Sequence, residues 1–555
     1  MKIELLNLRN SYKENKYIFD DNNRFSNRIL KIKTSYGWRT IDSPYDPEKE
    51  AVKSLGNSFN SQTSIVLIGA GSGYFLSEIL KKGISDIVLI TPYRSVAEQN
   101  YSLLSDYESI EGNAYIILAD VFDFEFQKNL SKILKKINSK KIIFHPRESK
   151  TFPQFFNPLS VYIESLNKKK NFSGQVNCIK RVLFPCSGQI IEKEIIKEFV
   201  KRGVEVFDTE SFNQRKIDSK SAWEIISRYE PDLIMSTNNK GSDFEGYIPS
   251  VCSMSGVKWA TWFLDDPRFI LSKNEIFEGQ KRYGFCWDVS GTEALNEIGF
   301  RNISMLPLAT DPEMFCPGEG DENLEGRIIY VGSPGFGNEE RYFSGLDKNS
   351  AAADLCKYFE NIIFTKRKIP AVVEIHSAIK ALNITNNFIE AELERLPAYT
   401  LYKANLNYRI KALNELADFN PIVYGEGWEG LLSDKVEKRG YVDYYRELPN
   451  IYRSDAVHIS LTHLQMRHYP NQRIFDVGAC AGVVVGDRVS GWNELFTSKL
   501  DELVFDNFEQ LKQKAYMFSQ SKDLRKEYGE KLKNEVLSKH TYGHRIDAVI
   551  DKLLS

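Results

Sequence analysis

Short apolar runs alternate with longer amphipathic segments along most of the chain. In the first part, the apolar runs at residues 64–69, 87–91, 115–119 and 141–145 have the length of strands, and the segments between them have a helical pattern. Strands that alternate with helices are typical of a parallel sheet with helices on both faces. This pattern predicts an α/β domain over residues 1–166.

The same alternation resumes after a basic, Asn-containing linker at residues 167–175. Strands are predicted at residues 181–184, 204–207, 233–236 and 259–263. A helix is predicted at residues 190–202, after the first of these strands and a short turn. We therefore expect a second α/β domain over residues 176–317.

A polar segment at residues 318–326 precedes a third domain, which we expect at residues 327–555. This domain opens with a predicted strand at residues 327–331. A stretch of helical character with few turn signals, residues 346–419, is interpreted as an insertion, and the end of the chain is also mostly helical. The whole chain is therefore predicted to be α/β, with three sheet-containing domains in succession.

Composition agrees with a multidomain cytoplasmic enzyme. The 555 residues leave room for about three domains of ~150 residues each, and 42% hydrophobic residues can fill their cores. No apolar run approaches the ~18 residues needed to span a bilayer, and the N-terminus lacks the apolar core of a signal peptide. A net charge of −2 argues against a nucleic-acid partner. The seven cysteines lack metal-ligand spacing, so neither a zinc site nor a disulfide framework is expected.

A glycine-rich turn follows the first apolar run. Gly69, Gly71 and Gly73 stand at alternate positions, where glycine lets the backbone approach a nucleotide closely at a helix N-terminus. The loop resembles that of S-adenosylmethionine-dependent methyltransferases. The acidic residue that would hold the ribose at the end of the next strand is missing, because that strand runs into Thr91. Methyl transfer is therefore an alternative function for this domain.

The most informative polar residues lie in segment 469–487. Arg473 and Asp476 are three residues apart, on one face of a helix, just before a small-residue turn and an apolar strand. This arrangement suits a nucleotide sugar. Its diphosphate needs positive charge and donors, which Arg473 and Asn471 offer, and its ribose presents two hydroxyls to a carboxylate such as Asp476. The alternative is an ordinary amphipathic helix with a surface ion pair.

Around these residues the sequence resembles the CgeB-like (spore-maturation-protein-like) glycosyltransferases, relatives of the large retaining class of GT-B enzymes. The resemblance is carried by Asn471, Arg473, Phe475, Asp476, Ala479, Cys480 and Gly482, and by residues 424–428, 440–444, 447–452, 495–496 and 540–545 in the same order. It covers residues 180–555 and implies two Rossmann-like domains that face a cleft. Residues 45–51 also resemble the N-terminal region of motility-accessory and flagellin glycosyltransferases, which implies a third, methyltransferase-like Rossmann domain in front.

The resemblance places the donor sugar nucleotide in the C-terminal half. Backbone N–H groups at Gly332 and Ser333 are expected to contact phosphate, Gly425 to form a turn at the donor, and Tyr441 to lie beside the nucleobase. His468 stands where the retaining class usually has a second glutamate, and it is a further donor candidate. The alternatives are tight-turn geometry for the glycines and a structural role for the histidine.

The acceptor is expected on the second domain. Asp265 and Asp266 end a predicted strand and precede a proline. Ligands of open α/β sheets bind outside the carboxyl ends of strands, so these carboxylates are the candidate catalytic residues, with Gly188 at the same cleft. An Asp-Asp-Pro sequence is also a common turn and helix start. The two residues do not form a D-x-D pair, and no metal is expected.

Together these features predict a metal-independent glycosyltransferase that moves a sugar from a nucleotide-sugar donor, with a UDP-sugar favoured, to an acceptor hydroxyl, with retention of configuration. The N-terminal module and the family resemblance favour a protein acceptor, such as a flagellin or another bacterial surface protein. No further cofactor is expected. Two alternatives stay open: an S-adenosylmethionine-dependent methyltransferase, and a non-catalytic sugar-binding scaffold.

Overall fold

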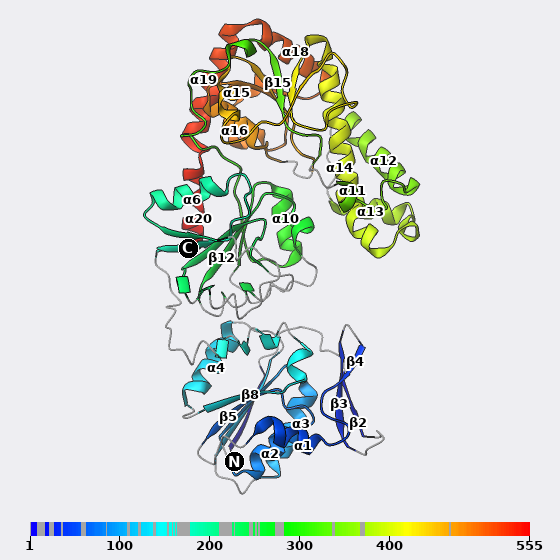
Figure 1. Cartoon of the computed structure of the whole chain (residues 1–555), viewed down its shortest axis with the longest axis vertical. Helices are drawn as coiled ribbons and strands as arrows, with labels where there is room; N and C mark the ends of the chain where they lie inside the picture. Colours follow the sequence, from blue (N-terminus) through cyan, green and yellow to red (C-terminus); the bar gives the residue numbers. More distant parts are fainter. Residues whose placement is uncertain are drawn as a thin grey trace.

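In the computed structural model, three parallel sheets follow one another in chain order along the long axis of the molecule (Figure 1). We call the parts built on them the N-terminal, middle and C-terminal units. The structure describes the chain except for residues 1, 8–16, 22–26, 35–36, 57–62, 85, 108–111, 120–123, 137–139, 153–154, 158, 161, 164–177, 210–224, 227, 243–247, 250–251, 253–255, 272–281, 336–338, 367–371 and 465–467. Among the helices of the described part, none combines the length and apolar character needed to cross a membrane.

The N-terminal unit has a five-stranded parallel sheet in the order β1-β7-β6-β5-β8. Its strands are β1 (Lys2–Asn7), β5 (Ser64–Ile68), β6 (Ile87–Thr91), β7 (Asn113–Leu118) and β8 (Lys140–Phe144), and its helices are α1 (Pro47–Leu55), α2 (Tyr74–Lys81), α3 (Arg94–Ser105) and α4 (Phe124–Lys136). The strands expected from the four apolar runs are confirmed. Strands β5 and β6 are buried along their whole length, which explains their unbroken apolar sequence.

A small antiparallel sheet in the same unit was not expected from the sequence. It consists of β2 (Tyr17–Asp20), β3 (Ile29–Thr34) and β4 (Gly37–Thr40). Its outer strands β2 and β4 have no fully buried residue, so they lack the continuous apolar runs that mark the strands of the large sheet.

The middle unit has a six-stranded sheet in the order β10-β9-β11-β12-β13-β14, with every pairing parallel. Its strands are β9 (Arg181–Phe184), β10 (Glu205–Asp208), β11 (Leu233–Thr237), β12 (Lys258–Phe263), β13 (Arg282–Cys286) and β14 (Asn302–Met305), and its helices are α6 (Glu192–Lys201), α9 (Pro267–Ile270) and α10 (Val289–Ile298). The four predicted strands and the helix after β9 are confirmed.

The C-terminal unit has a second six-stranded parallel sheet, in the order β17-β16-β15-β18-β19-β20. Its strands are β15 (Ile328–Val331), β16 (Ile422–Tyr424), β17 (Glu437–Arg439), β18 (Val457–Ser460), β19 (Val483–Asp487) and β20 (Val504–Phe505). Its helices are α11 (Glu339–Tyr342), α12 (Ser350–Lys366), α13 (Val372–Ala381), α14 (Glu390–Glu415), α15 (Leu448–Arg453), α16 (Gln472–Ala479), α17 (Trp492–Leu495), α18 (Phe508–Gln520), α19 (Lys522–Lys539) and α20 (Tyr542–Leu554). Helices α11 to α14 project to one side in Figure 1 and have their own apolar cluster.

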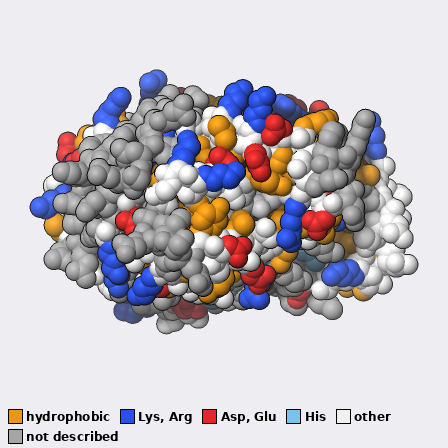
Figure 2. Space-filling model, turned by 90° about the horizontal axis from the view of Figure 1, so that it is seen from below, with side chains coloured by type: hydrophobic (Ala, Val, Ile, Leu, Met, Phe, Trp, Pro, Cys, Tyr) orange, Lys and Arg blue, Asp and Glu red, His pale blue; other side chains and the backbone are white. Residues whose placement is uncertain are grey.

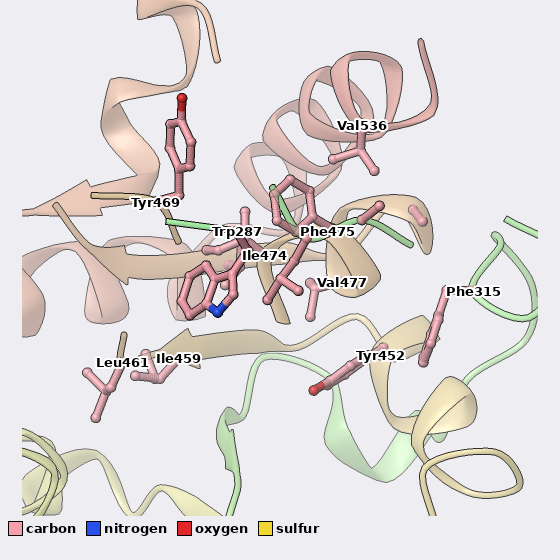
Figure 3. Packing of buried hydrophobic residues seen from close by; sticks show 14 of the residues in the cluster. Trp287, Phe315, Tyr452, Ile459, Leu461, Tyr469, Ile474, Phe475, Val477 and Val536 are labelled. Carbon is pink, nitrogen blue, oxygen red and sulfur yellow. The ribbon is translucent and has the colours of Figure 1, made fainter. Parts of the chain in front are cut away.

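Two six-stranded parallel sheets in succession confirm the predicted α/β class with two Rossmann-like units. The last helix returns from the C-terminal to the middle unit, where α20 packs on α6 and Arg202 Nε donates to Asp547 Oδ1 at 2.7 Å. One buried cluster spans both units. In Figure 3, Trp287 of the middle unit belongs to it together with Phe475 and Val477 of α16 and Val536 of α19.

The two faces of the middle sheet belong to different cores. Side chains alternate between the faces of a strand, and on β9 Val182 joins the core shared with the C-terminal unit, whereas Leu183 joins the core that contains the N-terminal sheet. On β11, Leu233 and Ile234 divide in the same way. The middle sheet is therefore packed on both sides, as its parallel strands require.

The surface at the N-terminal end of the long axis carries both signs of charge. Figure 2 shows this face, on which Lys and Arg side chains alternate with Asp and Glu among scattered hydrophobic ones. On the part of this face that the structure describes, neither sign forms a continuous field. This distribution agrees with the formal net charge of −2.

Candidate functional site

Two glycine turns meet at the carboxyl ends of β15 and β16. The Gly332 N–H donates to the Tyr424 carbonyl at 2.8 Å, and Trp428 Nε1 donates to the Gly332 carbonyl at 2.8 Å. Both Gly332 and Gly425 have positive φ, and a Cβ on Gly425 would lie 2.6 Å from the Gly332 carbonyl oxygen. Because only glycine allows this approach, the two turns form a fixed backbone surface at the carboxyl end of the sheet. The Ser333 carbonyl accepts from Arg409 Nη1 at 3.1 Å.

Arg473 lies at this surface, in the first turn of α16. Its guanidinium is 4.8 Å from the centroid of the Tyr330 ring and donates through Nη2 to the Val331 carbonyl. The Nε and Nη1 atoms are buried and have no hydrogen-bond partner, and a Cβ on Gly332 would lie 3.3 Å from Nη2. A cation with unsatisfied buried donors is costly, and an anion beside Gly332 would satisfy them.

Asn471 has a structural role in this geometry. As the N-cap of α16, its Oδ1 accepts from the Arg473 N–H at 3.2 Å and from Ser460 Oγ at 3.0 Å. Its Nδ2 donates to the Leu461 carbonyl at 2.9 Å. The side chain fixes the start of the helix, and with it the position of Arg473.

Asp476 faces the middle unit. It is 1% exposed and accepts from Thr310 Oγ1 at 2.8 Å, Gln472 Nε2 at 3.1 Å and the Tyr444 hydroxyl at 3.3 Å. Burial raises the pKa of its carboxyl well above the ordinary value. Arg473 and Asp476 share a helix but contact different partners, so the surface ion pair considered from the sequence is not what the structure shows.

A hollow of about 520 Å³ opens at the carboxyl ends of β16 and β17. Its lining residues come from the loop and helix after β16 and β17, and they are Tyr424, Arg439, Gly440, Tyr441, Val442, Arg446, Glu447, Asn450 and Ile451. Tyr441 is 68% exposed. Arg439 lies over the Tyr424 ring at 5.4 Å and donates to its hydroxyl at 2.6 Å. An exposed aromatic ring next to fixed polar groups suits a flat heterocycle.

His468 contacts a neighbouring loop and the middle unit. Its ring nitrogens lie 2.7 Å from Ser490 Oγ and 3.0 Å from Glu494 Oε1. Its backbone N–H donates to Asp288 Oδ2 at 2.5 Å, and that of Tyr469 donates to the same atom at 2.9 Å. Asp288 is buried and also caps α10. The sequence reasoning missed this link; the only local signal is an N-cap pattern at Asp288.

The candidate acceptor residues differ in accessibility. Asp266 is fully buried, caps α9 and accepts from the N–H and Nε of Arg268 at 2.9 and 3.1 Å. Burial raises its pKa against the opposing effect of Arg268. Asp265 is half-buried, and its Oδ2 accepts from Asn238 Nδ2 at 2.8 Å. Of the pair, Asp265 is therefore the one within reach of a substrate.

The turn around Gly188 holds a carboxylate of the chain itself. The N–H groups of Ser187, Gly188 and Gln189 donate to Glu192 Oε2 at 2.9, 2.9 and 3.2 Å. Glu192 is 3% exposed, and its Oε1 accepts from Thr237 Oγ1 at 2.8 Å. The backbone N–H donors of this loop are therefore already bonded to Glu192.

The glycine turn of the N-terminal unit is occupied in the same way. Gly71 N–H donates to Glu148 Oε2 at 2.7 Å, and Ser72 N–H donates to Asp42 Oδ2 at 2.8 Å. Both carboxyl groups are buried, and His145 Nε2 lies 3.2 Å from Asp42 Oδ1. A Cβ on Gly69 would lie 2.8 Å from the Glu148 carboxyl carbon. The sequence reasoning missed these carboxylates, because they stand 77 and 30 residues from the turn residues that they contact.

Gly73, the third glycine of that turn, has a φ of 102° and precedes α2 directly.

Within the described residues, no group of three or more His, Cys, Asp or Glu side chains is arranged to hold a metal ion.

Residues 408–551 match the family model described as "Glycosyl transferase-like". The chain carries a glycosyltransferase-like domain. This stretch contains Arg473, Asp476, His468 and the hollow around Tyr441, and it confirms the glycosyltransferase class expected from the sequence. A search of curated proteins gave no significant match.

Among solved structures, T4 phage BGT in complex with UDP-glucose is 11% identical, with a TM-score of 0.35 over 67% of this chain and 98% of that one. A glycosyltransferase from Rickettsia africae is 15% identical, with a TM-score of 0.37 over 68% and 98%. The Candida albicans trehalose-6-phosphate phosphatase N-terminal domain is 12% identical, with a TM-score of 0.31 over 90% and 98%. At these TM-scores no conclusion about function follows.

Proposed function

We propose that the protein is a glycosyltransferase that takes its sugar from a nucleotide-sugar donor without a metal ion. The observation that supports this most directly is the buried Arg473 guanidinium, whose Nη2 lies beside the Gly332 turn and whose Nε and Nη1 have no hydrogen-bond partner. A departing nucleoside diphosphate gains negative charge as the glycosidic bond breaks, and fixed donors stabilise that charge. A buried guanidinium supplies them without a metal ion.

The nucleoside would lie between Arg473 and the hollow. We place the base against Tyr441, and the ribose near Asp476, whose carboxylate now accepts from Thr310, Gln472 and Tyr444. A ribose hydroxyl can take the place of one of these donors because each is a neutral group. A UDP-sugar is the donor we favour.

On the acceptor side, we assign Asp265 rather than Asp266 to orient or deprotonate the acceptor hydroxyl. Asp265 is half-buried at the carboxyl end of β12, whereas Asp266 is engaged by Arg268. Membership of the CgeB-like family, a retaining outcome and a protein acceptor, such as a flagellin or another bacterial surface protein, are parts of the same proposal that rest on sequence resemblance. The seven cysteines, all described, are free thiols, which fits a reducing cytoplasm.

Methyl transfer by the N-terminal unit is the second candidate. S-adenosylmethionine binding at Gly69–Gly73 would require open backbone donors, whereas Glu148 and Asp42 now accept from Gly71 and Ser72. We therefore propose that the backbone donors of this turn stay bonded to these two carboxyl groups, and that the unit supports the fold or positions the acceptor.

The test is binding and turnover with purified protein and no added metal. Isothermal titration with UDP, GDP, ADP and CMP identifies the nucleotide, and release of free sugar from UDP-glucose and related donors measures turnover. Arg473→Gln should weaken nucleoside diphosphate binding by roughly tenfold or more, from the loss of charge-assisted bonds. Arg327→Gln, a partly exposed arginine at the start of the same sheet, is the control. Equal affinity in the Arg473 variant contradicts the phosphate assignment, and binding without any turnover favours the scaffold alternative.

A further inference from the structure

Three buried polar atoms lack partners where α6 of the middle unit meets the C-terminal unit. They are Glu194 Oε1, Gln472 Oε1 and the Tyr542 hydroxyl. Glu194 is 2% exposed, although it belongs to the first turn of a helix whose neighbouring Lys193 is exposed. Buried polar groups in folded proteins are nearly always hydrogen-bonded, and each exception needs an explanation. Tyr542 and Gln472 lie close enough to interact with each other, so Glu194 Oε1 is the atom that indicates a missing polar ligand.

The geometry connects Glu194 to the proposed donor site. The Tyr445 hydroxyl donates to Glu194 Oε2 at 3.4 Å, and the adjacent Tyr444 donates to Asp476 Oδ2 at 3.3 Å. The two tyrosine rings are 5.0 Å apart. Neighbouring residues 441, 442, 446 and 447 line the hollow. Two carboxyl groups, one from each unit, therefore face the same short loop that borders the hollow.

The lysines near Glu194 interact with other groups. Lys193 Nζ lies 4.2 Å from the centre of the Tyr445 ring, and Lys197 pairs with Asp311 at 2.7 Å and with Glu313 at 2.7 Å. Burial raises the pKa of Glu194, and Asp311 adds to this effect, whereas the backbone N–H of Glu194 itself, Tyr445 and Lys193 oppose it. A neutral ligand with hydroxyl groups fits such a pair of buried carboxyl groups better than an ion does.

If a ribose hydroxyl replaces one of the three donors of Asp476, the second hydroxyl of the diol still needs an acceptor. A vicinal diol needs two acceptors, and Glu194 has a free one. We propose that Glu194 of the middle unit binds the ribose diol of the nucleotide together with Asp476 of the C-terminal unit, so that donor binding joins the two halves. This inference rests on the proposed function, because it names a second contact for the same donor.

The test compares ribose and deoxyribose nucleotides. Isothermal titration with UDP, 2′-deoxy-UDP and 3′-deoxy-UDP is carried out on the full chain and on Glu194→Met, which keeps the side-chain length and removes both oxygens. We expect Glu194→Met to weaken UDP binding roughly tenfold, from the loss of one hydrogen bond to a carboxyl group. At least one deoxy nucleotide should bind the variant and the native protein equally, because the hydroxyl that Glu194 contacts is already gone. Glu194→Gln keeps an acceptor and should restore part of the affinity.

Several outcomes overturn the inference. If Glu194→Met weakens UDP and both deoxy nucleotides equally, the residue acts only through the structure of the interface. If UDP affinity is unchanged, the free oxygen serves an internal water. Glu205→Met, an exposed glutamate at the start of β10, controls for the substitution, and melting temperatures of all variants show whether they fold. If the native protein binds none of the four nucleotides UDP, GDP, ADP and CMP, the proposed function fails with the inference; if UDP binds and depends on Arg473, only the role of Glu194 is in question.

Discussion

Asp288→Ser should open the connection between the middle and C-terminal units without unfolding α10. The Asp288 carboxylate accepts from the N–H groups of His468 and Tyr469 at 2.5 and 2.9 Å, and also from Ser290 N–H at 2.9 Å. Serine is a good N-cap and keeps the last of these bonds. Its single oxygen on a shorter side chain cannot reach the other two.

The magnitude follows from the two lost bonds. A hydrogen bond to a charged group contributes about 1.5–3 kcal/mol, so losing two lowers the free energy of opening segment 468–469 by roughly 3 kcal/mol or more. A difference of about 1.4 kcal/mol is tenfold, and amide exchange reports local opening directly. Exchange of the His468 and Tyr469 amides should therefore accelerate about 100-fold.

Hydrogen exchange of the folded protein, read at the peptide that contains these two amides, measures the effect. Asp46→Ser is the matched control, because Asp46 caps α1 in the N-terminal unit by accepting from Lys49 N–H at 2.9 Å. The reasoning is refuted if the two amides exchange at the native rate in the Asp288 variant. It is also refuted if exchange rises equally throughout α10, since the effect would then come from the cap.

Three further predictions concern the candidate sites. Asp265→Asn should lower sugar transfer at least tenfold with nucleotide affinity unchanged, a loss typical of an acid–base residue, whereas Asp266→Asn should chiefly lower the melting temperature; steady-state kinetics and calorimetry separate the two, and equal turnover in Asp265→Asn contradicts the assignment. Glu148→Ala should lower the melting temperature, because Gly71 N–H loses its acceptor at a cost of about 1–3 kcal/mol, and S-adenosylmethionine should not shift the native value; a shift of several degrees with this ligand would revive methyl transfer. Burial raises the pKa of Asp476, so over the range between the two pKa values the folded state binds more protons than the unfolded state, and stability falls as pH rises from about 4 through the raised pKa; the melting temperature of Asp476→Asn should fall less steeply with pH, and identical slopes would count against a raised pKa.

Local patterns were enough to predict the framework of the large sheets. The strands β5 and β6 are short apolar runs between helical segments, and burial on both faces makes such runs continuous. The N-cap alternative for Asp266 was also visible, because an acidic residue before proline is a common helix start. The helix that carries Arg473 and Asp476 was predicted as well, and it is α16.

The sequence could not show which distant groups form hydrogen bonds with each candidate residue. Thr310 donates to Asp476 across 166 residues, and Asp288 accepts from His468 across 180. Such contacts depend on how two units are placed against each other, and no local period encodes that. Glu194 was missed for the same reason: on the sequence it is one of several charged residues in an amphipathic helix, and only its burial against Tyr445 distinguishes it.

Leu233 and Ile234 pack into different cores, so the two faces of the middle sheet pack against the two neighbouring units. Removal of the N-terminal unit would expose one apolar face of the middle sheet to water, which favours aggregation. A shortened enzyme would therefore need surface redesign on that face alone, at alternate positions of each strand, while the other face keeps its native residues. Destabilisation of either neighbouring unit should also destabilise the middle sheet. The three units are therefore expected to unfold as a coupled assembly rather than as independent domains.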